Sequence, residues 1–183
     1  MDPKLIFKHA YQVAILDEAA MKKVAADKEG LPAALLVVGI ASLATALGRV
    51  LFPMNMGMIV YRPDWMSTLG LAITSFFMTL LTLFVVGVLA QQVFKSKLSP
   101  RSFVQVMGMG QVVGILTLIP ALSFVSCLWL VVIFFFTLRR LDQLSWGSIV
   151  LLIVLTVMVM AVLAAVLDLM GFSPLYGSAL PWN

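Results

Sequence analysis

Four stretches of the chain contain no charged side chain and are rich in Leu, Val, Ala, Met and Phe. They cover residues 30–48, 65–94, 102–138 and 143–167. A helix needs about 20 apolar residues to cross a bilayer. The third stretch is nearly twice that long, and Pro120 and Ser123 near its middle predict a tight turn between two helices.

This pattern predicts five membrane-spanning helices. We place them at about 31–49, 67–93, 103–119, 123–139 and 147–169. The third and fourth are short, so a re-entrant hairpin is the alternative there.

Composition narrows the fold class further. Hydrophobic residues make up 62% of the chain and charged residues 11%, whereas a soluble domain has roughly 25% charged residues. The apolar segments are continuous, without the alternation that a membrane β-strand shows. We therefore expect an all-α, polytopic transmembrane helical bundle.

The distribution of Lys and Arg predicts the orientation of this bundle. If the N-terminus is cytoplasmic, ten of these residues fall on the cytoplasmic side and only Arg49 and Arg62 outside, as the positive-inside rule requires. The ten are Lys4, Lys8, Lys22, Lys23, Lys28, Lys95, Lys97, Arg101, Arg139 and Arg140. We expect a multi-pass protein of the bacterial plasma (inner) membrane, with residues 171–183 as a short outer tail.

Residues 1–30 mix five lysines with five acidic residues and predict two short amphipathic helices on the cytoplasmic surface. In the first, Ile6, Ala10 and Val13 lie roughly opposite Lys4 and Lys8, as an interfacial helix requires. Asp17 is the expected N-cap of the second helix. The chain thus divides into these surface helices, a membrane domain at 31–170 and the outer tail.

The segment "GMGQVVG" at 108–114 holds the main candidate site. Gly110 and Gly114 have the i, i+4 spacing that lets two membrane helices approach closely, and Gln111 could hydrogen-bond across that contact. We interpret the three residues as a helix-packing site, with a polar spot that contacts a substrate as the alternative. Two charged residues, Arg49 and Asp168, fall at equal predicted depth at the outer interface. We expect them to form an ion pair between the first and last spans, or to extend separately towards water.

No residue pattern indicates catalysis, a metal site or a cofactor. His9 is the only histidine and Cys127 the only cysteine, and no phosphate-binding loop or set of Ser, His and Asp is recognisable. The basic residues form no dense block of the kind that binds nucleic acid. We expect no enzyme activity, no cofactor and no nucleic-acid partner.

Three segments, read in order, resemble bacterial members of the Yip1-domain family. They are "AYQVAILDEAAMKKVAADKEGLPAALLVVGIASLATALG", "LSPRSFVQVMGMGQVVGILTLIPALSFVSCLWLVV" and "LRRLDQLS", and the resemblance covers nearly all of residues 5–168. Gln111 and its neighbours depart from the pattern, because many relatives have a proline there. The resemblance implies a five-span, Yip1-like membrane protein of poorly defined biochemical role.

We therefore expect a non-enzymatic membrane protein that organises or associates with other membrane proteins or lipids. Its expected partners are the lipid bilayer and either other membrane proteins or further copies of itself. A small-molecule or ion transporter, a channel or a lipid-scrambling module is the alternative.

The predicted orientation can be tested with a single introduced cysteine. In a Cys127→Ser background, Lys97→Cys should react with a membrane-impermeant thiol reagent only after the membrane is opened, because the loop that carries it is predicted to be cytoplasmic. Labelling of this cysteine in intact cells would contradict the orientation.

Overall fold

The computed structural model describes residues 3–52, 55–56, 59–60 and 65–169, and side chains up to Val166. Its helices are α1 (Pro3–Ala14), α2 (Glu18–Ala26), α3 (Leu31–Leu51), α4 (Trp65–Phe94), α5 (Pro100–Gly110), α6 (Pro120–Phe136) and α7 (Trp146–Leu169). The segments η1 (Gln111–Leu118), a 3₁₀-helix, and η2 (Thr137–Leu141), a π-helix, continue α5 and α6. Strands β1 (Asn55–Met56) and β2 (Ile59–Val60) pair antiparallel.

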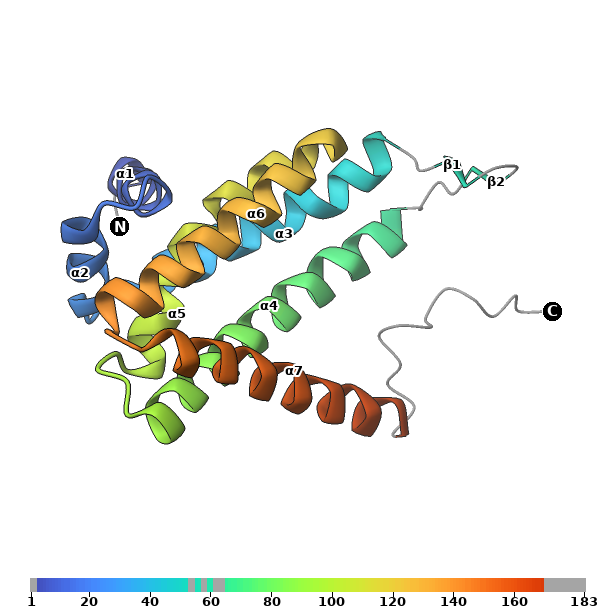
Figure 1. Ribbon diagram of the computed structural model, residues 1–183. Coiled ribbons are helices and arrows are strands. Elements are labelled where there is room, and N and C mark those ends of the chain that lie inside the picture. Colours follow the sequence, from blue (N-terminus) through green and yellow to red (C-terminus); the bar gives the residue numbers. More distant parts are fainter. Residues whose placement is uncertain (1–2, 53–54, 57–58, 61–64, 170–183) are drawn as a thin grey trace.

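The all-α helical bundle expected from the sequence is confirmed. Four helices among the described residues are long and apolar enough to cross a membrane: Leu31–Leu51, Trp65–Phe94, Pro120–Leu141 and Trp146–Val166. Figure 1 shows α3, α4, α6 and α7 running between the same two ends of the molecule. The N-terminal helices lie near one end, and β1 and β2 lie at the other.

The third predicted span, at 103–119, is not one continuous α-helix. It begins as α5 and continues from Gln111 as η1. An α-helix rises about 1.5 Å per residue and a 3₁₀-helix about 2.0 Å, so the two pieces together extend roughly 30 Å. The turn that follows is at Ile119, and α6 begins directly at Pro120 rather than at residue 123. Whether this segment crosses the bilayer stays a prediction.

The α5 helix lies in the middle of the bundle. All eight residues from Phe103 to Gly110 are buried, and α5 contacts α1, α2, α3, α4 and α6. A helix that is buried on every side must fit against each neighbour. The rest of the fold is therefore arranged around residues 100–118.

Glycines let the backbones come close at both ends of this central segment. A Cβ atom on Gly48 of α3 would lie 2.6 Å from the carbonyl oxygen of Thr117 in η1. One on Gly87 of α4 would lie 2.9 Å from Cα of Pro100, where α5 begins. Both contacts are with backbone atoms, which cannot rotate away as a flexible side chain can.

The first helix packs on the bundle as well as lying at its surface. Ile6, Ala10 and Val13 are buried and belong to the same apolar core as α5. The indole Nε1 of Trp129 in α6 donates a hydrogen bond to the carbonyl oxygen of Ala14, at 2.7 Å. Figure 1 shows α1 nearly end-on, so it runs across the bundle rather than along it.

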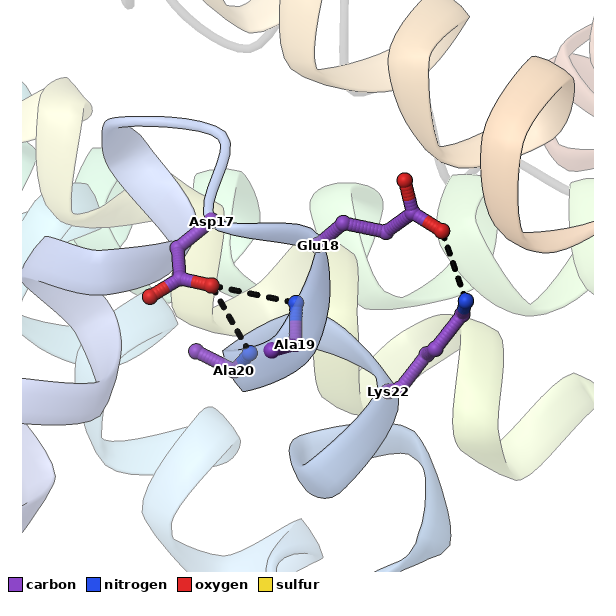
Figure 2. A network of polar contacts seen from close by, with 5 residues as sticks. All are labelled: Asp17, Glu18, Ala19, Ala20 and Lys22. Atoms are coloured by element: carbon purple, nitrogen blue, oxygen red, sulfur yellow. Dashed lines mark hydrogen bonds and ion pairs between the residues drawn. The ribbon is translucent and has the colours of Figure 1, made fainter.

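The second helix begins as its sequence predicts. Figure 2 shows the Asp17 carboxylate accepting hydrogen bonds from the backbone N–H groups of Ala19 and Ala20, at 3.0 and 3.1 Å. One turn further on, Lys22 forms an ion pair with Glu18, at 2.6 Å. The hydrogen bond from Lys22, its positive charge and, more weakly, Arg140 lower the pKa of Glu18. The pair is exposed, so it contributes little to stability.

Two matched glycine substitutions test the close packing. Gly48→Ala should destabilise the protein by about 1–3 kcal/mol, because its methyl group collides with the η1 backbone. Gly70→Ala in α4 should be neutral or stabilise by up to about 1 kcal/mol, because nothing beyond its chain neighbours and the adjacent backbone of its own helix lies within 4 Å of its Cβ position. Thermal unfolding in detergent measures both; equal stabilities of the two variants would contradict the packing.

Candidate functional site

The glycines of the "GMGQVVG" segment contact different helices. A Cβ on Gly114 would lie 3.0 Å from Cβ of Ala41 in α3, whereas one on Gly110 would lie 3.1 Å from Ile133 in α6. Gly108 faces Ala34 of α3, also at 3.0 Å. The single contact that the i, i+4 spacing suggested is therefore not formed: Gly110 and Gly114 are both packing glycines, but they pack against different neighbours.

Gly110 and Gly114 contact different helices because the helix type changes at Gln111. In a 3₁₀-helix the side chains three residues apart lie above one another, so Gln111, Gly114 and Thr117 share one face of η1. Gln111 Oε1 lies 3.8 Å from the Cβ position of Gly114. Thr117 forms a hydroxyl–hydroxyl hydrogen bond with Thr45 of α3, at 2.8 Å. The η1 segment thus presents a polar row to its neighbours within an apolar bundle.

Gln111 lies at one side of a cavity of about 360 Å³ between η1 and α4. Its other polar lining residues are Ser75, Thr79 and Thr82. The Thr82 hydroxyl donates to the carbonyl of Met78 in its own helix, at 2.8 Å, as membrane threonines commonly do. Within the described residues we find no hydrogen bond from the Gln111 side chain across a helix contact. Its amide is instead available to the cavity, which combines three hydroxyl groups with one amide.

A further hydroxyl ties α6 to the 3₁₀ segment. Ser126, fully buried in α6, donates a hydrogen bond to the carbonyl oxygen of Val113, at 2.9 Å. Sequence reasoning did not single out Ser126. Its position directly opposite η1 depends on the turn at Ile119 and could not be read from spacing within α6.

Asp142 is a second site that the sequence did not reveal. It is 3% exposed, and its Oδ1 accepts hydrogen bonds from the Ser96 hydroxyl and from the backbone N–H of Leu98, the latter at 3.0 Å. Its Oδ2 is buried and has no hydrogen-bond partner among the residues described. Asp142 thus joins the loop after α4 to the loop before α7. Both loops turn through a residue in the left-handed region, Lys95 in one and Gln143 in the other.

The expected pair of Arg49 and Asp168 stays a prediction. Arg49 is exposed near the end of α3, whereas the side chain of Asp168 lies outside those that the structure describes. In Figure 1, α4 lies between α3 and α7, and the far ends of α3 and α7 diverge. A direct pair would require those ends to be brought together.

No grouping among the described side chains resembles a metal centre, since no three His, Cys, Asp or Glu residues there come together. Comparison with known proteins adds no assignment: no family model, no curated protein and no solved structure matches the chain.

Two substitutions of Asp142 separate the role of its accepting oxygen from the role of its charge. Asp142→Ala should destabilise the protein by about 1–3 kcal/mol, because two partly buried donors, the Ser96 hydroxyl and the Leu98 N–H, lose their acceptor. Asp142→Asn keeps the accepting oxygen and removes a buried charge, so its stability should equal or exceed that of the wild type. Thermal unfolding in detergent compares them, and an Asn variant as unstable as the Ala variant would show that the charge itself is required.

Proposed function

We propose that the protein is a non-enzymatic, multi-pass membrane protein that organises or associates with other membrane proteins or lipids. This proposal rests on the observation that the rest of the protein leaves most of α7 uncovered. Among its described side chains only Ile149, Leu152 and Thr156 are buried. Large apolar side chains point outward from the rest of the helix, and five of them are more than half exposed: Trp146, Val150, Val157, Met158 and Val162. In a membrane, such a face is covered by lipid or by another membrane protein.

The proposed location is the bacterial plasma membrane, with the N-terminus in the cytoplasm. Figure 1 shows the loops before α5 and before α7 at the same end of the bundle as α1 and α2. Their common position supports the proposed orientation. Polar contacts join these segments: Gln105 of α5 donates to the carbonyl of Asp27 at 2.8 Å, and Arg101 donates to the carbonyl of Lys28. Membership of the Yip1-domain family is part of the same proposal and rests on the ordered sequence motifs.

Transport, conduction or lipid scrambling is the second candidate. One observation favours it, namely the cavity that combines Gln111 with Ser75, Thr79 and Thr82. Polar groups in membrane-spanning helices commonly mark a substrate or ion path. This cavity holds hydroxyl and amide groups and no ionisable residue, so a path built on it would suit water or a small neutral polar solute better than an ion.

Liposome and solubilisation experiments separate the two candidates. We expect purified protein in liposomes to give no solute flux and no lipid flip above that of protein-free liposomes. Solubilised from native membranes in a gentle detergent, it should keep a protein or lipid partner in fixed stoichiometry. Gln111→Leu should leave that partner in place, because Gln111 lies beside α4 and away from the exposed face of α7.

If solute flux is observed, a matched pair of variants shows whether it depends on the cavity. Flux that Gln111→Leu abolishes and Thr74→Val preserves would contradict the organising role and establish the second candidate. Thr74 is an exposed threonine of α4 outside the cavity, so its replacement controls for the general loss of a polar group from a membrane helix.

A further inference from the structure

A large groove opens where α6 ends and α7 begins. Its volume is about 740 Å³. One part of its lining is polar or cationic and consists of Arg139, Arg140, Gln143 and Trp146; the other part is the apolar side of α6 that includes Val131 and Phe135. No carboxylate lines it. In the sequence, the two arginines served as markers of the cytoplasmic side and as part of the "LRRLDQLS" segment.

A second, apolar cavity lies next to the groove. This cavity has a volume of about 350 Å³ and lies between α4, α5, α6 and α7. Val131 and Phe135 line both spaces, so the two lie next to each other along one side of α6. Cys127 lies in the apolar part, twelve positions before Arg139. At about 1.5 Å per residue this separation is roughly 18 Å, close to the depth of one leaflet, which is half of a hydrocarbon core of about 30 Å.

The two arginines are held differently. Arg139 donates to the carbonyl oxygen of Leu144 at 2.9 Å, and its guanidinium carbon lies 5.8 Å from the centroid of the Trp146 ring. A guanidinium has five N–H donors, so most of those on Arg139 remain available. Arg140 is exposed and makes no hydrogen bond to any side chain or backbone group described. Glu18 of α2 is close enough to be affected by its charge, but Glu18 is paired with Lys22.

We propose that this groove binds an anionic phospholipid. The inference rests on the proposed function and names a lipid partner for it. The phosphate would sit at Arg139 and Arg140, because guanidinium groups match phosphate oxygens in charge and geometry. The indole of Trp146, at the first residue of α7, would lie where headgroups meet hydrocarbon, as membrane tryptophans do. The acyl chains would follow α6 from Phe135 towards Cys127, in the space that α7 leaves open.

A second copy of the chain fits this groove less well. The two arginines would lose water on contact with a partner helix and would then need carboxylates. Among the acidic side chains near that end of the bundle, Glu18 is paired with Lys22, Asp17 caps α2 and Asp142 is buried. A lipid supplies both the negative charge and the apolar chains.

The test uses the purified full-length protein alone, so it does not depend on capturing a protein partner. Native mass spectrometry counts bound phosphatidylglycerol against phosphatidylcholine with the same acyl chains. We expect a preference of about tenfold or more for phosphatidylglycerol, because two cations near the headgroup each add to the attraction. Arg139→Gln/Arg140→Gln should remove this preference. Lys23→Gln/Lys28→Gln, which removes the same charge outside the groove, should keep it.

A second pair of variants tests the apolar part. Val131→Trp should reduce retention of phosphatidylglycerol about tenfold with both arginines intact, because it fills the junction of the two cavities. Val150→Trp on the exposed side of α7, outside both cavities, should retain the lipid. Glycerol phosphate at millimolar concentration should not displace the lipid, since it lacks acyl chains.

Several outcomes would overturn the proposal. They are equal retention of the two lipids by the wild type, an unchanged preference after loss of both arginines, displacement by glycerol phosphate, or a lipid-free dimer that Val131→Trp disrupts. If the double arginine variant does not fold, the single variant Arg140→Gln is tested instead. Arg140 makes no hydrogen bond to a described backbone group, so its replacement should not disturb the fold. Failure here is distinct from failure of the proposed function, which would show instead as solute flux that depends on Gln111.

Discussion

The close enclosure of α5 from Phe103 to Gly110 is the constraint on which the rest of the structure depends. Helices surround these eight residues, so none of them is left for lipid. Its neighbours approach it through glycines, and at Gly48 and Gly87 even a methyl group would meet backbone atoms. Without a hydrophobic driving force between helices in lipid, such close van der Waals contact is a main source of attraction.

The change from α-helix to 3₁₀-helix at Gln111 occurs where the chain leaves this enclosed part and packs against α3 and α6. A 3₁₀-helix is narrower and longer per residue than an α-helix, so η1 reaches the end of α3 with few residues and fits between α3 and α6. Side-chain hydroxyl groups supplement its poorer hydrogen-bond geometry, because Ser126 of α6 donates to the carbonyl of Val113 and Thr117 of η1 itself donates to that of Gly114. The polar row on η1 is thus part of how a buried backbone satisfies its carbonyls.

Sequence alone predicted the features that depend on long apolar stretches of the chain. The four long helices and the turn near Pro120 are all read from hydrophobicity and proline, because both act locally. The partners of the glycines were not predictable in this way. Gly110 and Gly114 were assigned to one face on the assumption of 3.6 residues per turn, and a local period of three places them against different helices. Asp142 was missed for a related reason: a charged residue in a short loop is usually solvated, and only the folded arrangement of two loops buries it.

The bundle combines a tightly packed part with a loosely attached one. The helices around α5 are joined by backbone-to-backbone contacts and buried hydroxyl groups, whereas α7 meets the rest mainly along α4 and through the loop that Asp142 holds. Burial of Ile149, Leu152 and Thr156 fixes one side of α7, and the side towards α6 is separated from it by the groove. An occupant of that groove would give α7 the second packing surface that it lacks. Because α6 is already fixed by Ser126 and Trp129, α7 is the helix whose position such binding would stabilise.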